Sequence, residues 1–184
     1  MGRRNNSRTF EIALSAIACA IAAGALALGL LSGWLVGTGY VVAVVALMLP
    51  LSKQFFWGGF LAYLGTVILA VVLGAVIKFW DLVPFAMFFG LHPLANCLQI
   101  RFKINRWLAY AIKAVGFDCT LIAGYFLIYV LGGIALPEQV AAAIEGWRLY
   151  VIIFTVGTAI FLLYDYLIFK AQIGVNRLVY RIRK

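Results

Sequence analysis

Long apolar runs separated by short hydrophilic gaps dominate this chain of 184 residues. Six runs approach the length of about 20 residues that a helix needs to cross the hydrocarbon core of a bilayer. They lie near residues 12–31, 34–51, 55–77, 82–100, 107–131 and 147–170. The pattern therefore predicts an all-α integral membrane protein, in which residues 1–184 form a single domain, one bundle of six transmembrane helices. The first turn is expected at Ser32-Gly33 or at Gly37-Thr38-Gly39, which leaves the second helix short.

The composition excludes most soluble classes of protein. Apolar residues make up 66% of the chain and charged residues only 11%, whereas globular proteins are about half apolar and about a quarter charged. The mean hydropathy is +1.06. A chain of this size has too little interior to hide that much apolar surface, so the remainder is expected to face lipid. A soluble enzyme, a disordered chain and a disulfide-stapled secreted fold are excluded on this ground.

The charges are distributed unevenly between the two sets of predicted helix ends. The net charge is +9, and 13 of the 15 basic residues belong to one set. These are Arg3, Arg4, Arg8, Lys53, Arg101, Lys103, Arg106, Lys113, Lys170, Arg177, Arg181, Arg183 and Lys184. Lys78 and Arg148 belong to the other set, beside Asp81, Glu138 and Glu145. The positive-inside rule then predicts a multi-pass protein of the bacterial plasma membrane with both termini in the cytoplasm.

The basic residues also bear on the partners of the chain. No long soluble face exists to carry nucleic acid, so contact with the anionic headgroups of the lipid bilayer is the better interpretation of the net charge. The segment before the first helix, residues 1–11, is a short cytoplasmic N-terminus. The tail, residues 171–184, alternates basic and apolar residues. It is expected either to lie on the bilayer surface with its arginines at phosphates, or to continue the sixth helix and end in water.

The five tryptophans support the same helix assignment. Trp34, Trp57, Trp80, Trp107 and Trp147 all fall at the ends of predicted helices, and none lies near a middle. Indole prefers the membrane interface because its ring is apolar while its N–H requires a hydrogen-bond partner. The positions therefore agree with the proposed helix boundaries.

Small residues recur at four-residue spacing along the first predicted helix. Ala16, Ala20 and Gly24 form one stripe, and Ala18 and Ala22 form a second. Such stripes let another helix approach the backbone closely, which is where packing energy comes from inside a bilayer. They predict either packing against the other helices of this chain or a docking surface for a separate membrane subunit.

Ionisable residues at membrane depth are costly and are therefore candidates for function. Counting about 1.5 Å per residue from the cytoplasmic helix ends places Asn96 and Asp165 at roughly 6–8 Å, Lys113 at roughly 9 Å, His92 at roughly 12 Å and Asp118 at roughly 16 Å. We expect one polar cluster on the last three helices. Its role is either structural, with Lys113 paired to Asp165 and with His92 or Asn96 satisfying Asp118, or that of a substrate or proton site. Asp118 is the strongest single candidate because it is too deep to reach the interface.

A proline lies next to this predicted cluster. Pro93 follows His92 in the fourth predicted helix and removes one backbone hydrogen bond. Together with Gly90, it predicts a kink in that helix. Broken helices at this depth often line binding cavities in transporters, although a kink tolerated for packing alone is an equal alternative.

The motifs of enzymes and metal sites are missing. The chain has one histidine and no His-Glu-x-x-His, Gly-x-Ser-x-Gly or P-loop sequence, so no catalytic residues, cofactor or metal ligands are expected. Cys19, Cys97 and Cys119 all fall in apolar stretches and are interpreted as small packing residues. The chain is therefore predicted not to be an enzyme.

Several segments resemble a known family of membrane proteins. They are RTFEIALSA at residues 8–16 with the Ala-rich helix that follows, FFGLHPL at residues 88–94, and WLAYAIK at residues 107–113 followed by Phe117-Asp118. The chain is similar in these segments to the six-span substrate-binding (S) components of energy-coupling factor (ECF) transporters. The resemblance covers most of the chain, although no motif of a particular substrate is matched.

The resemblance implies a function and partners. An S component captures a small nutrient and docks through an Ala-x-x-x-Ala surface on its first helix onto a transmembrane T component, which two cytoplasmic ATPases drive. Ala16 with Ala20, and Ala18 with Ala22, match that spacing. The chain has no histidine-rich amino terminus of the kind expected of a metal-ion member, which leaves a small organic nutrient as ligand. The alternatives are a structural or assembly protein of the membrane, and a stand-alone proton-linked carrier that uses Asp118 and His92.

Overall fold

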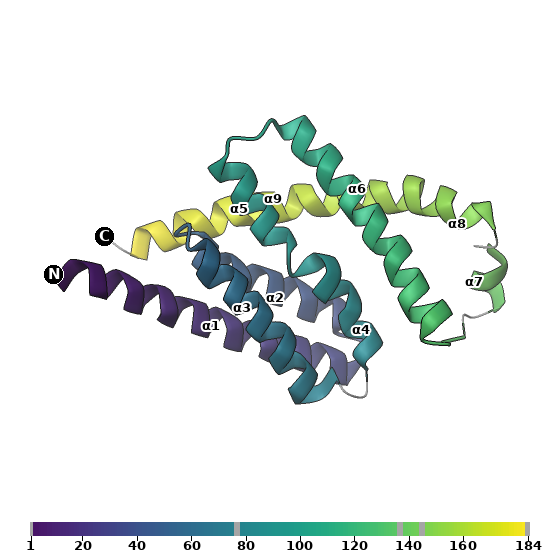
Figure 1. The fold of residues 1–184 in the computed structure, drawn as a ribbon, viewed down its shortest axis with the longest axis horizontal. Coiled ribbons are helices and arrows are strands. Elements are labelled where there is room, and N and C mark those ends of the chain that lie inside the picture. The colour runs from purple at the N-terminus through teal and green to yellow at the C-terminus, as the bar shows by residue number, and fades with distance from the viewer. Residues whose placement is uncertain (1, 76–77, 136–137, 144–145, 183–184) are drawn as a thin grey trace. The chain divides into compact units, whose positions relative to one another are not determined.

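The computed structural model describes residues 2–75, 78–135, 138–143 and 146–182, and over these residues the chain is helical with no strand. The predicted all-α class is confirmed (Figure 1). Residues 76–77 of the third predicted span, and Arg183 and Lys184 of the tail, lie outside the described residues. In chain order the elements, with η for π-helical segments, are α1 (Gly2–Ser32), α2 (Val36–Leu51), α3 (Phe56–Ala70), η1 (Val71–Ala75), α4 (Phe79–Pro84), η2 (Phe85–Phe89), α5 (His92–Arg101), α6 (Arg106–Tyr125), η3 (Phe126–Leu131), α7 (Glu138–Ala143), α8 (Trp147–Ile152), η4 (Ile153–Gly157) and α9 (Thr158–Ile182).

Five helical segments of the described chain are long and apolar enough to cross a membrane. They are Arg8–Ser32, Phe56–Leu73, Phe79–Arg101, Arg106–Leu131 and Trp147–Tyr180. The second predicted span is shorter, because α2 has 16 residues and is therefore about 24 Å long. Large apolar side chains on the long segments face outward, and Leu28 and Val72 are 70% and 71% exposed. An apolar exterior of this extent is consistent with insertion into a membrane.

The turn between α1 and α2 falls at the first of the two predicted positions. Gly33 has a φ of +71°, a conformation that glycine adopts without the steric penalty of a Cβ atom. Its N–H donates to the carbonyl of Gly29 over 3.1 Å and closes the last turn of α1. The indole of Trp34 follows and is 98% exposed, as expected of a tryptophan at a helix end.

The chain divides into two compact units. Unit 1 comprises Met1–Lys103 together with Ile168–Lys184, and unit 2 comprises Ile104–Leu167. The 25 residues of α9 contribute to both units. That the two units close into a single bundle stays a prediction.

Unit 1 is built around the packing of α1 against α2 and α3. The backbones of α1 and α2 approach so closely that a Cβ atom on Gly39 would lie 2.7 Å from the carbonyl oxygen of Ala25 and 3.3 Å from Gly29 Cα. Only glycine fits at such a contact, which is how small residues bring membrane helices together. The core beside it is apolar, with Leu26 and Leu47 each 1% exposed.

The third helix runs alongside the first in the same direction. A Cβ atom on Gly58 would lie 2.5 Å from Ser15 Oγ, and one on Gly65 would lie 2.9 Å from Cys19 Sγ. Residues further along α3 therefore meet residues further along α1. The helix α2 lies between them in the sequence and runs back along α1 in the opposite direction, as Figure 1 shows.

The fourth predicted span is interrupted where Pro93 predicts a kink. The helix α4 passes into the π-helical η2, and the chain then turns at Gly90 and Leu91 before α5 begins. Pro93 occupies the first turn of α5, where its missing N–H is not needed. Gly90 packs against the ring of Tyr63, whose hydroxyl donates to a backbone carbonyl of η2 over 2.5 Å. The α3 helix therefore holds the interruption in place.

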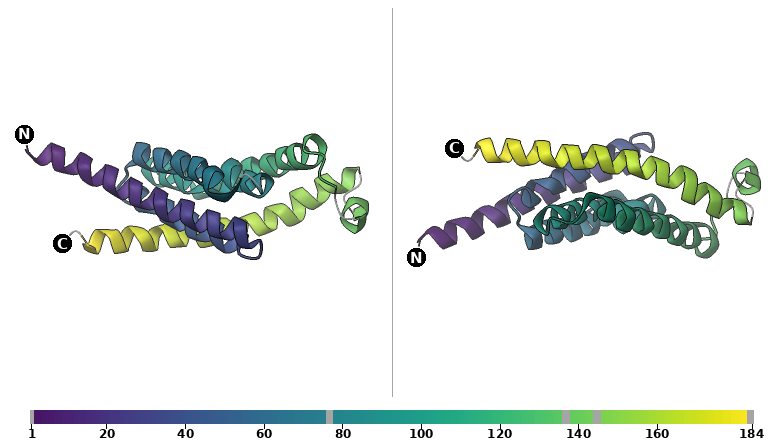
Figure 2. Two further views of the ribbon diagram at one scale, coloured as in Figure 1. Left: turned by 90° about the horizontal axis from the view of Figure 1, so that it is seen from below. Right: turned by 90° about the horizontal axis from the view of Figure 1, so that it is seen from above.

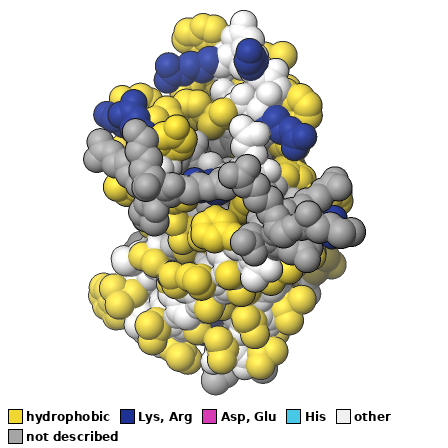
Figure 3. All heavy atoms as spheres, turned by 90° about the vertical axis from the view of Figure 1, so that its left-hand side faces the viewer, with side chains coloured by type: hydrophobic (Ala, Val, Ile, Leu, Met, Phe, Trp, Pro, Cys, Tyr) yellow, Lys and Arg dark blue, Asp and Glu magenta, His cyan; other side chains and the backbone are white. Residues whose placement is uncertain are grey.

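Both ends of the chain lie toward the same end of unit 1 (Figures 1 and 2). The described part of the tail continues the last helix, as the second of the two alternatives predicts, because α9 runs unbroken from Thr158 to Ile182. Lys53, in the turn between α2 and α3, donates to the carbonyl of Val179 over 3.2 Å and ties the tail to that turn. Figure 3 views this end, where Lys and Arg side chains stand among apolar ones and no Asp or Glu of the described residues is visible.

Candidate functional site

The five residues of the predicted polar cluster are all buried, but they belong to two different units. His92 and Asn96 lie on α5 in unit 1, and are 2% and 0% exposed. Lys113, Asp118 and Asp165 lie on α6 and α9 in unit 2, and each is less than a tenth exposed. The structure therefore brings three of the five together within one unit, and the prediction of a single cluster stays a prediction.

The predicted ion pair of unit 2 is present. Lys113 Nζ donates to Asp165 Oδ1 over 2.5 Å, and both side chains are buried. The ammonium group also lies 5.6 Å from the centre of the Tyr110 ring, in cation–π contact. Arg106 donates to the hydroxyl of the same tyrosine over 2.7 and 2.9 Å. Buried charges are tolerated when they are paired and hydrogen-bonded. The contacts of Lys113 with Asp165 and Tyr110 are therefore compatible with the structural interpretation of Lys113.

The ion pair is one contact in a regular antiparallel packing of α6 on η4 and α9. Four residues along α6 from Lys113, the ring of Phe117 stacks on Phe161, with ring centres 5.2 Å apart and planes at 25°. Four residues further, a methyl group of Leu121 lies 3.0 Å from the Cβ position of Gly157. Each step of four forward on α6 is matched by four backward on the partner segment. The helices therefore pack with a fixed register over two turns.

Asp118 lies one residue beyond the aromatic stack and has a different partner from the predicted ones. Its two carboxylate oxygens accept from Thr158 Oγ1 over 3.2 and 3.1 Å. Asp118 is 5% exposed, and among the described residues no hydrogen bond or ion pair other than that to Thr158 reaches it. A hydroxyl carries one proton whereas a carboxylate can accept about four hydrogen bonds, so Asp118 retains unused capacity as an acceptor. That His92 or Asn96 completes it stays a prediction, because both lie in the other unit.

A buried polar stripe follows α5 in unit 1. His92, Asn96 and Gln99 are spaced by four and three residues, so they share one face of the helix, and all three are buried. The ring of His92 lies against Phe88, with centres 5.4 Å apart. The stripe begins directly after the interruption at Gly90, so the break in the helix and the polar face belong to the same part of unit 1.

The two small-residue stripes of α1 face in opposite directions. Ala18 and Ala22 are completely buried, and this stripe is part of the packing of unit 1. Ala16 and Ala20 are exposed, Gly24 is half-buried, and nothing lies within 4 Å of a Cβ atom built on Gly24. The stripe of Ala18 and Ala22 is therefore internal, and the stripe of Ala16, Ala20 and Gly24 is left uncovered by the other helices of unit 1. That a separate subunit docks on it stays a prediction.

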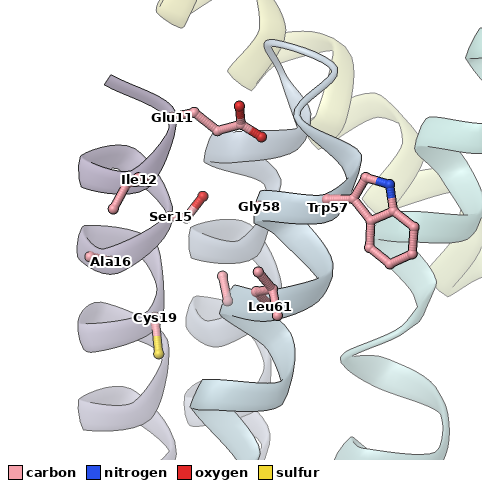
Figure 4. Close-up of a pocket in the computed structure, with 9 residues that line it drawn as sticks. Glu11, Ile12, Ser15, Ala16, Cys19, Trp57, Gly58 and Leu61 are labelled. Atoms are coloured by element: carbon pink, nitrogen blue, oxygen red, sulfur yellow. The ribbon is translucent and has the colours of Figure 1, made fainter. Parts of the chain in front are cut away.

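A shallow groove runs beside the open stripe, between α1 and α3 (Figure 4). It has a volume of about 340 Å³ and is mostly apolar. It is lined by Glu11, Ile12, Ser15, Ala16, Cys19, Trp57, Gly58, Leu61 and Ala62. The Oγ atom of Ser15 is buried without a hydrogen-bond partner and points toward α3. The groove therefore continues from the exposed side of α1 at Ala16 onto the adjacent residues of α3.

Three buried polar side chains were not predicted, namely Thr66, Gln99 and Gln172. Thr158, the half-buried partner of Asp118, was not predicted either. Thr158 and Gln172 are each spaced by seven residues from Asp165, so the three share one face of α9, and this seven-residue spacing of polar residues is a signal that the sequence carries. Among the residues that the structure describes, no group of three His, Cys, Asp or Glu side chains is placed to hold a metal ion.

Comparisons of the chain with models of protein families, with curated proteins and with solved structures return no match. The resemblance to S components of ECF transporters therefore rests on the residues of the chain itself.

Proposed function

We propose that the chain is the substrate-binding subunit of a multi-component importer of the ECF type, which captures a small organic nutrient and has no ATPase of its own. The observation that carries the proposal is the division of the two stripes on α1. An importer subunit that docks through its first helix needs one small-residue face open to the bilayer, and Ala16 and Ala20 provide it. A protein whose stripes serve only its own packing would have both faces buried.

The proposal includes six membrane crossings. The helix α2 is about 24 Å long, shorter than the hydrocarbon core of about 30 Å, but it returns the chain from the far end of α1 to the start of α3. Membranes thin locally and flanking residues reach outward around short helices. The parallel course of α1 and α3, with Gly58 beside Ser15 and Gly65 beside Cys19, supports counting α2 as a crossing.

The proposal also places both termini in the cytoplasm of a bacterial cell. The ends of the chain lie toward the same end of unit 1, and the contact of Lys53 with Val179 joins a basic turn to the basic tail. The positive-inside rule assigns such an end to the cytoplasm. The cytoplasmic ATPases of the importer would then lie on the side of the membrane that carries both chain ends.

For the ligand, we propose Asp118 as the principal contact. It is a buried carboxylate with spare acceptor capacity, and Thr158 beside it offers a hydroxyl oxygen. Such a pair suits a nutrient that carries N–H or O–H donors. Lys113 and Asp165 form an ion pair with each other, and we assign them a structural role.

A structural or assembly protein is the second candidate, and the buried ion pair favours it. Lys113 and Asp165 account for two of the costly intramembrane charges without any ligand. On this alternative the polar side chains fix the packing of α6 on α9, and the chain needs no importer partner.

Affinity purification of the tagged chain from its native membrane tests the proposal. We expect a transmembrane T component and two ATPases to co-purify with the wild type, and Ala16→Leu or Ala20→Leu to abolish this by filling the open stripe. Ala111→Leu is the matched control, because Ala111 is an exposed alanine on α6 and does not belong to the stripe. The melting temperature in detergent should be unchanged by Ala16→Leu. An unchanged complex in the Ala16 and Ala20 variants, or a wild-type chain that purifies alone, would exclude the proposal.

A further inference from the structure

An open groove lies at the basic end of unit 1, where the ends of α2 and α5 meet the last turns of α9. It has a volume of about 680 Å³, within the range of sites that hold small molecules. Ser52 lines it from the C-cap of α2, Ile100 from α5, and Asn176, Arg177 and Tyr180 from α9. This groove shares no lining residue with the one beside Ala16. The importer proposal leaves it without a role.

The polar side of the groove is a set of hydrogen-bond donors. Arg177 contributes a guanidinium group, whose fork of N–H donors matches phosphate. Asn176 accepts from Gln172 Nε2 through its Oδ1 atom over 3.2 Å, which leaves its amide N–H₂ group to donate elsewhere. Gln172 is itself 1% exposed, so the orientation of Asn176 is set by a buried neighbour. The groove therefore offers two donor groups, the guanidinium of Arg177 and the amide of Asn176, and the second is held in place by Gln172.

The charge around the groove has one sign. Lys53 lies 5.9 Å from the centre of the Tyr180 ring while it donates to the backbone of the tail, and Arg101 directly follows the lining residue Ile100. The three stretches of unit 1 around the lining residues, 49–57, 96–103 and 168–182, contain no Asp or Glu. A groove with several cations and no acidic residue in its own segments is complementary to an anion.

The other side of the groove is apolar. Phe169 and Ile173 line it on α9, about two turns and one turn before Arg177 respectively, together with Ile100 of α5. A soluble anion would gain nothing from these side chains, whereas a phospholipid presents a phosphate followed directly by apolar acyl chains. The order along α9, apolar residues first and donors after them, matches the order from acyl chain to headgroup in a leaflet.

We propose that this groove binds an anionic phospholipid. The headgroup phosphate lies at Arg177, Asn176 and Tyr180, and an acyl chain lies along Phe169 and Ile173. The bound lipid then fastens the tail of α9 to the ends of α2 and α5. The proposal holds whether or not the chain belongs to an importer, since it concerns only unit 1 and its end at the membrane surface.

Lipid titration of the purified full-length chain tests this, with bound lipid counted by native mass spectrometry. We expect phosphatidylglycerol to bind at one saturable site and phosphatidylcholine to bind more weakly. Arg177→Gln should weaken the binding of phosphatidylglycerol by about five-fold or more, as expected for the loss of one basic residue next to a phosphate, and Arg177→Lys should weaken it less. The matched control is Arg148→Gln, an exposed arginine in unit 2, which should leave the binding unchanged.

A charge-neutral variant separates the groove from a diffuse basic surface. Ile173→Trp fills the apolar side and should reduce binding without changing any charge, while the melting temperature of the lipid-free protein stays within a few degrees of the wild type. Equal binding of the two lipids, or an equal effect of Arg148→Gln and Arg177→Gln, would overturn the proposal. Displacement of phosphatidylglycerol by inorganic phosphate as effectively as by dihexanoyl phosphatidylglycerol would also overturn it, because the occupant would then be a free anion.

Discussion

Removing one member of the Lys113–Asp165 pair is the sharpest test of how unit 2 is held together. The two side chains are in contact at 2.5 Å, and their exposures are 8% and 0%. In Lys113→Met, the carboxylate of Asp165 keeps its buried position without the ammonium group. In Asp165→Leu, the ammonium group of Lys113 loses the carboxylate. In both variants a charge is left in an apolar interior, which is the costly case for a buried ion pair.

The expected magnitudes follow from the burial of the pair. Breaking a fully buried pair costs about 3–5 kcal/mol, whereas replacing both members by apolar residues of similar volume is often neutral or stabilising. We therefore expect each single variant to lose about 3–5 kcal/mol of unfolding free energy. The double variant Lys113→Met/Asp165→Leu should lie within about 1 kcal/mol of the wild type or above it. The coupling free energy of the two sites should accordingly exceed about 3 kcal/mol.

Reversible unfolding in mixed micelles, followed by circular dichroism, measures these differences. Lys170→Met is the matched control, because Lys170 is an exposed lysine on the same helix as Asp165, and exposed ion pairs contribute less than about 1 kcal/mol. A double variant as unstable as the two single variants combined would show that the charges contribute independently. That result would refute the assignment of the pair as a structural unit.

Two further predictions concern a backbone contact and the candidate ligand residue. The Gly39→Leu variant should lose about 3 kcal/mol or more of unfolding free energy in the same assay, because a Cβ atom at this position would lie 2.7 Å from a backbone oxygen of α1. Gly37 has open space around it, so Gly37→Leu should change the unfolding free energy little. Equal losses in the two variants would contradict the close contact at Gly39. Asp118→Asn should release any small molecules that mass spectrometry finds bound to the purified wild type, while the unfolding free energy changes by less than about 1 kcal/mol. Unchanged retention in Asp118→Asn, or equal release by Thr120→Val, would contradict a ligand role for Asp118.

The sequence could predict the Lys113–Asp165 pair because both residues lie at a similar depth, measured from helix ends that the basic residues mark. Depth is a one-dimensional quantity, and for two adjacent antiparallel helices it nearly determines which residues meet. The same reasoning could not find Thr158 as the partner of Asp118. A threonine is compatible with an apolar environment and gives no signal in a count of charges. Its position, seven residues before Asp165, carries the information, but only once the buried face of α9 is known.

The small-residue stripes show a different limit of sequence reasoning. Ala16 with Ala20 and Ala18 with Ala22 have identical spacing and nearly identical chemistry. Which stripe is buried depends on the angle at which α2 and α3 approach α1. That angle is set by glycines on the other helices, such as Gly39, where a backbone contact allows no side chain. A pattern of small residues along one helix predicts that another helix packs closely against it. Which face of the helix is buried depends on the residues of the partner helix.

The difference between Asp118 and Asp165 is the strongest argument for assigning them different roles. Both are carboxylates on helices of the same unit, and both are nearly or completely buried. Asp165 is paired with an ammonium group at contact distance. Asp118 faces a neutral hydroxyl, which offers one proton to two oxygens. A carboxylate in that position can still accept a hydrogen bond from a donor outside the helix pair. The surrounding register is fixed by the Phe117–Phe161 stack, so Asp118 is held in position for such a donor by packing that does not depend on its own charge.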